Sequence, residues 1–389
     1  MQASLYIHVP FCAGSCDYCD FYSVPINRPD QGSADSRLNI YVKNLLLEGE
    51  RLFKTFKPAE IPSVYIGGGT PSVLGAAGIS CLLDGINKII LQYAPSPKEI
   101  TVEANPESAD EAFLNAARES GATRLSMGLQ TFYGPSRRAV NRVGAELCSG
   151  ETGLSKRLIL AADYFPEAFS IDLMSGLPLQ SEKILLNDIH SALSYKPAHI
   201  SLYALTLEAE TPLKNKLPPG DEADRLWLCG RDTLEKAGFN QYEVSNFCLE
   251  GKESRHNIRY WRLQSWLALG PAASGTIIDD ETGSGFRYTV PPDLDQWMGN
   301  REQGIGIREE LDSLTLIKET FLMGFRYIEG PDGELFRRRF HRCIADYIPK
   351  TIKTWRNRGF MQNGKIALTK EGLLFLDSFL SDAFLELEL

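Results

Sequence analysis

The sequence predicts an α/β protein built on a partial (β/α)6 barrel, followed by a small, mostly helical C-terminal domain. Short β-branched and aromatic runs alternate with amphipathic stretches of helical length, which favours parallel strands joined by right-handed crossovers. Polar residues or glycines follow nearly every predicted strand, as expected when a barrel builds one site from many loops. The alternation fades beyond residue 215.

Six strand–helix units are predicted in this first part. The helix expected over 38–56 shows the pattern, because Leu45, Leu52 and Phe53 form an apolar stripe opposite charged residues. Periodicity alone does not choose between a barrel and a doubly wound sheet. The polar strand ends favour the barrel, since a doubly wound sheet concentrates such chemistry at one switch point. The predicted strands are 5–9, 64–66, 100–103, 124–127, 170–174 and 200–204.

We divide the chain into three predicted parts. Residues 1–215 form the barrel core, 216–309 extend it, and 310–389 form the small C-terminal domain, for which a winged helix is one candidate form. Proline-containing breaks at 218–220 and 291–292 interrupt the middle part. Helices are expected over 222–236, 314–325, 336–358 and 370–379.

Composition excludes several classes of protein. Lysine plus arginine gives 41 and aspartate plus glutamate gives 50, so the net charge of −9 argues against a nucleic-acid binder. Hydrophobic residues at 43% and charged residues at 23% are ordinary globular usage, which excludes a disordered chain. No uninterrupted apolar run reaches the roughly 18 residues that a membrane span needs, and the N-terminal residues do not resemble a secretory signal. We therefore expect a cytoplasmic protein without a stable membrane span.

Three cysteines carry the strongest chemical signal. Cys12, Cys16 and Cys19 place three thiols on a loop that leaves the first strand. Soft ligands this close suit a metal ion or an iron–sulfur cluster. A structural zinc ion normally takes four ligands, and the candidates for a fourth are His8 and distant cysteines. A [4Fe–4S] cluster with three cysteine ligands leaves one iron open, so we favour the cluster and keep zinc as an alternative.

The CxxxCxxC spacing and the later GGGTP run at 67–71 resemble the radical S-adenosylmethionine (radical SAM) superfamily. Longer matches resemble one group within it, which contains oxygen-independent coproporphyrinogen III oxidases and HemW-type heme chaperones. The matches lie in order along nearly the whole chain. They are 5–12, 19–21, 102–106, 126–132, 141–142, 171–178 and 256–261.

The resemblance implies a set of cofactors. Cys12, Cys16 and Cys19 would hold a [4Fe–4S] cluster, and the amino and carboxylate groups of S-adenosylmethionine would chelate the open iron. An electron from the reduced cluster would then release a 5′-deoxyadenosyl radical. A reductant such as flavodoxin or ferredoxin is the implied electron donor.

The resemblance also implies which residues bind S-adenosylmethionine. Glycines at 67–69 would let the backbone approach the methionine moiety, and a following threonine and proline can start a helix. Independently of any family, carboxylates at the ends of apolar strands are costly without a partner. The implied cofactor-binding residues are Tyr6, Tyr18, Gly68, Gly69, Thr70, Glu103, Gln130, Arg142, Asp172 and the backbone at Ala204.

Two branches of this group imply different functions. The oxidases carry a cysteine two positions after the third cluster ligand, where this chain has Phe21, and they carry an N-terminal extension not expected here. The stretch 256–261 resembles the segment associated with heme in the chaperones. His256 is a candidate heme ligand, and a packing or capping histidine is the alternative. Ser274 stands where many relatives place a histidine, which could change how heme is held.

We therefore expect a HemW-type heme chaperone that binds a [4Fe–4S] cluster, S-adenosylmethionine and heme, and passes heme to an unidentified acceptor. No catalytic residue is assigned. The alternative is an oxygen-independent coproporphyrinogen III oxidase, which converts its substrate to protoporphyrinogen IX by oxidative decarboxylation. A zinc-stabilised binding module is a third alternative, which leaves Glu103, Gln130 and Asp172 unexplained.

Overall fold

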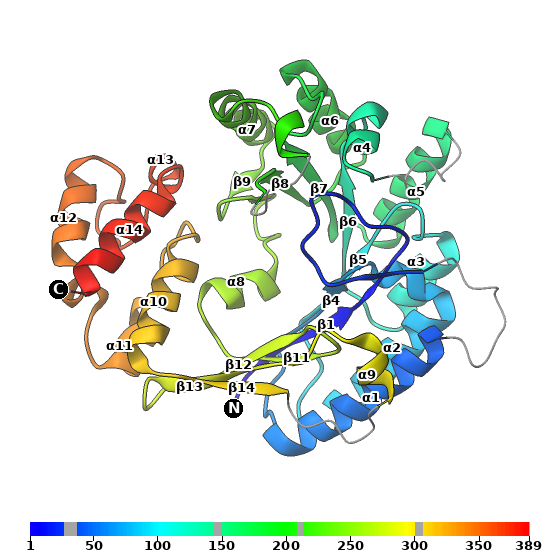
Figure 1. Ribbon diagram of the computed structural model, residues 1–389, viewed down its shortest axis with the longest axis horizontal. Helices are drawn as coiled ribbons and strands as arrows, with labels where there is room; N and C mark the ends of the chain where they lie inside the picture. The colour runs from blue at the N-terminus through cyan, green and yellow to red at the C-terminus, as the bar shows by residue number, and fades with distance from the viewer. Residues whose placement is uncertain (27–36, 143–149, 208–212, 300–305, 389) are drawn as a thin grey trace.

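The computed structural model describes residues 1–26, 37–142, 150–207, 213–299 and 306–388. Within this part of the chain, the strands form one curved sheet of twelve and a two-stranded ribbon of β2 (Phe11–Cys12) and β3 (Val24–Pro25). Figure 1 shows helices along the outer side of the curve, and α8 (Arg255–Trp261) on its inner side. The C-terminal helices lie across the open side.

Six adjacent parallel strands form the middle of the sheet. They are β1 (Ser4–Val9), β4 (Ser63–Gly68), β5 (Glu99–Ala104), β6 (Arg124–Gln130), β7 (Phe169–Ser175) and β8 (His199–Ala204). The helices that follow them are α1 (Arg37–Phe56), α2 (Gly75–Ile90), α3 (Glu111–Glu119), α4 (Gly134–Ala139), α5 (Gly150–Tyr164), α6 (Glu182–Ser194) and α7 (Gly220–Lys236). The predicted strands and the partial (β/α)6 barrel are confirmed.

The sheet continues beyond these six strands on both sides, which the sequence did not predict. On one side, β11 (Trp266–Leu269) runs parallel to β1, and β12 (Ser274–Asp279), β13 (Ser284–Thr289) and β14 (Ile307–Leu311) follow antiparallel. On the other, β10 (Asn246–Cys248) and β9 (Asn240–Gln241) extend β8. These strands lack the strand–helix rhythm on which the prediction depended.

The two faces of the six central strands differ in polarity. Alternate residues such as Ile7, Ile66 and Val102 are fully buried in the core that the outer helices cover. The residues between them point inward and are mostly polar. Hydrogen bonds across this inner face join Ser63 to Ser4 and Ser126 to Asp172. Because strands alternate with period two, the outer residues hold the helices and the inner residues are left for chemistry.

The C-terminal region has a second core, formed by α10 (Ser313–Gly324), α11 (Gly333–Phe340), α12 (Pro349–Asn357), α13 (Lys370–Leu373) and α14 (Leu376–Leu387). The single helix predicted over 336–358 is wrong. It is interrupted at His341, which adopts a left-handed conformation with φ 56°, and restarts at Pro349. The helix predicted over 370–379 is likewise divided near residue 375. The winged helix stays a prediction.

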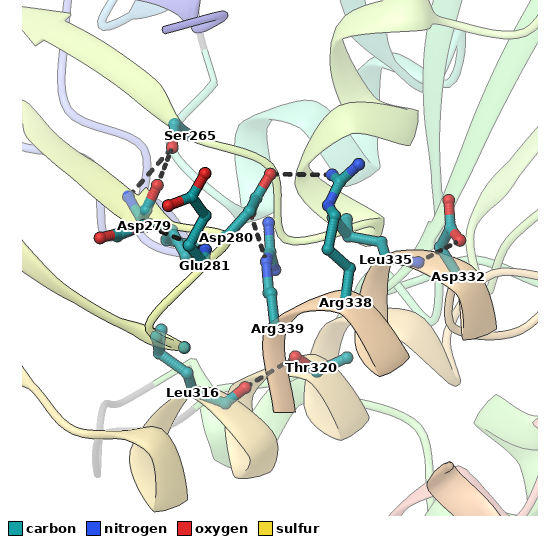
Figure 2. A network of polar contacts seen from close by, with 12 residues as sticks. Ser265, Asp279, Asp280, Glu281, Leu316, Thr320, Asp332, Leu335, Arg338 and Arg339 are labelled. Carbon is teal, nitrogen blue, oxygen red and sulfur yellow. Dashed lines mark hydrogen bonds and ion pairs between the residues drawn. The ribbon is translucent and has the colours of Figure 1, made fainter. Parts of the chain in front are cut away.

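The hairpin between β12 and β13 fastens this C-terminal core to the sheet. Asp280 lies in its turn, and Figure 2 shows two arginines of α11 reaching it. Arg338 Nη2 lies 2.9 Å from Asp280 Oδ2, and Arg339 Nε lies 2.7 Å from Oδ1. The Arg339 side chain is only 2% exposed, so Asp280 neutralises a buried cation.

One helical stretch, Pro71–Ile90, is long and apolar enough to span a membrane by length and composition alone. In the structure it includes α2. Ile79, Leu82, Leu83 and Ile86 of that helix are buried in the main core. The stretch therefore packs as a core helix of the barrel.

We predict that Asp280→Ala lowers the free energy of unfolding by about 1 to 3 kcal/mol, because Arg339 would remain buried without its partner. Urea denaturation followed by circular dichroism measures this change. Glu167→Gln is the matched control, since it removes an exposed ion pair with Lys252 and should leave the unfolding midpoint unchanged. Equal stability of Asp280→Ala and the parent protein would contradict this role.

Candidate functional site

The three cysteines lie on the loop that follows β1, at the carboxyl end of the central strands. Cys12 ends β2, and its Sγ lies 3.3 Å from Thr70 Oγ1. The turn over the other two is closed by the Cys19 amide, which donates to the Cys16 carbonyl over 3.1 Å. Cys12 and Cys16 are half-buried and Cys19 is exposed. The loop thus presents all three thiols at one end of the barrel.

Arg142 connects this loop to the strands. Its Nη1 lies 3.8 Å from Cys16 Sγ, and its Nη2 donates to Asn105 Oδ1 over 2.9 Å and to the Gly128 carbonyl. Asn105 Nδ2 in turn donates to Thr70 Oγ1 over 3.0 Å. A continuous polar chain therefore runs from Cys12 to Cys16 through three strand ends. Asn105 lies in the matched stretch 102–106, but the sequence alone predicts no role for it.

The donor set of this loop suits a cluster better than a single ion. Across the described residues, no three His, Cys, Asp or Glu side chains converge closely enough to hold one metal ion. A zinc ion needs its thiolates around one point, whereas a [4Fe–4S] cluster bonds each thiolate to a different iron. Three thiols spread over one loop beside a guanidinium therefore fit a cluster, whose soft irons prefer thiolates.

His8 is not available as a fourth ligand. Its Nδ1 lies 3.0 Å from the Tyr6 hydroxyl and its Nε2 lies 2.8 Å from the Tyr22 carbonyl. Burial lowers the pKa of the imidazole, and the ring is 4% exposed. With both ring nitrogens engaged, His8 supports the cysteine loop and takes no part in metal binding.

Two carboxylates occupy the middle of the inner face. Tyr65 donates to Glu103 Oε1 over 2.5 Å, and Ser201 donates to Asp172 Oδ1 over 2.7 Å. Burial, with the neighbouring Asp172 charge, raises the pKa of Glu103 to about 7, and burial also raises the pKa of Asp172. Neither carboxylate forms an ion pair with a described residue. The arrangement therefore favours a cationic ligand, which would stabilise both negative charges.

Gln130 ends β6 in a left-handed conformation with φ 68°, where the pairing of β6 with β7 shifts register. Asp188 of α6 holds the two residues that follow, accepting from Thr131 Oγ1 over 2.6 Å and from the Phe132 amide over 2.8 Å. Gln130 Oε1 and Ser175 Oγ, the latter at the end of β7, are both buried and have no hydrogen-bond partner within the described chain. The left-handed backbone and the unpaired oxygens lie at this strand end, and a ligand contact of Gln130 stays a prediction.

Comparisons with known proteins identify the family of this chain. A model of the radical SAM superfamily matches residues 6–183. A protein of Buchnera aphidicola subsp. Schizaphis graminum named heme chaperone HemW is 31% identical, over 97% of each chain. The chain belongs to the radical SAM superfamily. A mouse protein named radical S-adenosyl methionine domain-containing protein 1, mitochondrial, is 34% identical, over 84% of this chain and 73% of that one.

The fold of this radical SAM protein is similar to that of a solved structure. It is described as coproporphyrinogen III oxidase (HemN) from Escherichia coli, a radical SAM enzyme. The TM-score is 0.78 over 98% of this chain and 90% of that one, at 20% identity. At this identity the likeness shows the fold alone. Superfamily membership implies a [4Fe–4S] cluster and S-adenosylmethionine, and it removes the zinc-stabilised module as an alternative.

The glycines expected to contact the methionine moiety of S-adenosylmethionine pack closely against other atoms of the protein. A Cβ on Gly67 would lie 2.8 Å from Glu103 Oε2, and one on Gly69 would lie 2.5 Å from the Phe11 carbonyl. Gly68 has a φ of +104° and faces the His8 ring. The packing against the neighbouring strands and the cysteine loop therefore requires these glycines, and their contact with S-adenosylmethionine stays a prediction.

The remaining predicted cofactor residues lie at the same end of the barrel or on its inner face. Tyr6 points inward and stacks on Tyr65, with ring centroids 6.4 Å apart. Tyr18 belongs to the cysteine loop and packs beside a small apolar cluster that includes Met174. Ala204 ends β8 and pairs with Ser175. The structure thus gathers these positions around one mouth, and their roles as cofactor ligands stay predictions.

His256 lies apart from this mouth. It belongs to α8 at the opposite, amino end of the strands, where its Nδ1 is 2.9 Å from Ser63 Oγ and its ring packs on Tyr65 and Tyr260. The side chain is 1% exposed, and burial, with nearby Arg259, lowers its pKa to about 3. The ring is thus enclosed by the protein's own residues, and a contact of His256 with heme stays a prediction.

We predict that Glu103→Gln stabilises the cluster-free protein at pH 8 by up to about 3 kcal/mol, and little at pH 4.5. The folded state raises the pKa of Glu103 from its ordinary 4.5 to about 7, so it binds more protons than the unfolded state between these values. Stability is therefore lost as the pH rises through this range, and glutamine removes that loss. Urea unfolding at both pH values measures it, and an identical pH dependence in the variant would refute the assignment.

Proposed function

We propose that this chain is a heme chaperone of the HemW type, which binds a [4Fe–4S] cluster, S-adenosylmethionine and heme and passes heme to an acceptor protein. One observation carries the proposal. Relatives named heme chaperone HemW, from Buchnera aphidicola and from Bacillus subtilis, are each 31% identical over at least 95% of this chain. Phe21 supports the same branch, since the oxidase branch would place a cysteine there.

Cys12, Cys16 and Cys19 would hold the cluster, with Arg142 as the neighbouring cation. When bound and reduced, the cluster supplies an electron to the sulfonium of S-adenosylmethionine. The guanidinium near Cys16 would stabilise the negative charge of the thiolates. Because Arg142 also bonds Asn105 and the Gly128 carbonyl, it would keep the cysteine loop in register with the strand ends.

S-Adenosylmethionine would occupy the inner face between this loop and the two carboxylates. Its sulfonium is cationic, so Glu103 and Asp172 offer the complementary charge. The unpaired Gln130 Oε1 would accept a hydrogen bond from the ligand at the mouth. Each of these residues binds and orients, and none is proposed to transfer a proton.

The heme would bind without His256 in this arrangement. His256 holds α8 against the strands through Ser63, and the amides of Arg255 and His256 also donate to Glu99 over 3.0 and 2.9 Å. Such a buried network fits the packing histidine that the sequence left open as an alternative. The heme acceptor is not identified by any feature of the chain, and the reductant and the cytoplasmic location stay predictions.

The second candidate function is coproporphyrinogen III oxidation. The fold likeness to HemN over nearly the full chain favours keeping it. Phe21 argues against it, since this side chain is 65% exposed and offers no thiol beside the cluster. The two functions differ in whether a porphyrin is chemically changed.

We predict that anaerobic reconstitution with iron and sulfide gives about four of each per chain. Serine at Cys12, Cys16 or Cys19 should abolish uptake, because a hydroxyl is a poor ligand for soft irons. Cys81→Ser is the matched control, since Cys81 is an exposed thiol on α2 away from the loop. Iron and sulfide analysis with absorption spectra gives the readout. Full iron content in all three loop variants would contradict the assignment.

We predict that the reconstituted protein binds heme and that His256→Ala leaves its Soret absorption unchanged while lowering stability, because that ring packs and does not ligate. A heme titration followed by absorbance, and thermal unfolding of the same samples, measure both effects. Parallel incubation with coproporphyrinogen III, S-adenosylmethionine and a reductant should yield no protoporphyrinogen. Turnover without heme binding would replace the chaperone by the oxidase, and a Soret band lost in His256→Ala would restore that histidine as a ligand.

A further inference from the structure

The amino end of the barrel interior contains a cation that no described residue neutralises by direct contact. Arg124 is the first residue of β6 and points to the inner face, on the same side as Ser126 and Asp172. It is 7% exposed, and its guanidinium donates no hydrogen bond and forms no ion pair within the described chain. A buried guanidinium normally has its donors engaged, so the donors of this one are available to a ligand.

The two nearby carboxylates, Glu103 and Asp172, do not pair with the Arg124 guanidinium. Glu103 and Asp172 lie on the same face, and the Arg124 charge acts to lower the pKa of each carboxyl. Neither carboxylate contacts Arg124 directly. Their oxygens are already engaged by Tyr65, Ser126 and Ser201. The guanidinium therefore stabilises the two negative charges from a distance. Its N–H groups form no hydrogen bond with either carboxylate.

Two other groups with unused hydrogen-bonding capacity surround Arg124. Thr101 pairs with Arg124 in the strand register, is fully buried, and its Oγ1 has no partner within the described residues. Tyr65 pairs with Thr101 on the next strand, and His256 packs on that tyrosine with its Nε2 also unpartnered. Thr101 and Arg124 define the floor of the barrel interior, and the His256 ring lies beside it.

We propose that this barrel floor is a binding site for a carboxylate group of a ligand. A guanidinium presents a planar fork that matches a carboxylate with two parallel hydrogen bonds. The Thr101 hydroxyl adds a donor on one side. The proposal is independent of the proposed heme function, since none of its residues belongs to the cysteine loop or contacts it.

The position of the floor limits how such a ligand lies. Arg124 and Gln130 stand at opposite ends of β6, roughly 20 Å apart at the usual rise of a strand. Glu103 and Asp172 lie between these ends. A ligand anchored by its carboxylate at Arg124 would therefore extend toward the mouth, and its negative group would stay as far as the barrel allows from the two carboxylates.

Carbon-13-labelled acetate and propionate are the probes for this site. We expect saturable line broadening of the labelled carboxylate by the cluster-free protein at constant ionic strength. Arg124→Gln should weaken the affinity at least tenfold, and Arg124→Lys, which keeps the charge without the fork, should weaken it less. Arg225→Gln is the matched control, since that arginine is exposed on α7, and it should bind like the parent protein.

Chloride and sulfate titrations separate a carboxylate site from a general anion site. Displacement of acetate by either ion at concentrations equal to the acetate affinity would overturn the carboxylate assignment. Equal broadening by the parent protein and Arg124→Gln would overturn the site itself. If circular dichroism shows that neither Arg124 variant folds, Thr101→Val decides. It keeps the side-chain shape and should weaken binding two- to fivefold, and unchanged affinity in this variant would refute the site.

Discussion

The six central strands bury one face under helices and turn the other inward, and the rest of the structure depends on this division. Outward residues such as Leu5, Val64 and Ile171 are fully buried and apolar, so they hold the helices by apolar burial. The inward residues are thereby free to be polar. A closed barrel fills its interior with branched apolar side chains, whereas this open one keeps hydroxyls, carboxylates and a guanidinium there. The candidate site is the upper part of that polar face.

The inner face carries its charges in layers. The mouth has Arg142 beside the cysteine loop, the middle has Glu103 and Asp172, and the floor has Arg124. Positive charge therefore lies above and below the two carboxylates without direct contact. This arrangement costs stability, because burial raises the pKa of both carboxylates. A cationic ligand in the middle layer would relieve that cost, which couples binding to the preformed shape of the barrel.

The sequence predicted the parts of this molecule that follow local rules. Alternation of strands and helices located all six central strands, and the spacing of Cys12, Cys16 and Cys19 located the loop at their carboxyl end. It could not show that His256 packs beneath the strands, because burial against Ser63 depends on a pairing 193 residues apart. It also missed the edge strands β11 to β14, which have no helical partners. Nor does the sequence reveal that Arg124 is buried on the inner face, since an unpaired side chain has no signature in a sequence.

The central claim is that the cysteine loop and the two inner carboxylates form one pocket, in which S-adenosylmethionine meets a cluster. The most direct measurement is electron paramagnetic resonance of the reduced, reconstituted protein with and without S-adenosylmethionine. The account predicts that the ligand changes the cluster signal, and that Asp172→Asn requires about ten- to a hundredfold more ligand for the same change. A cluster signal that S-adenosylmethionine does not alter in the parent protein would contradict the account.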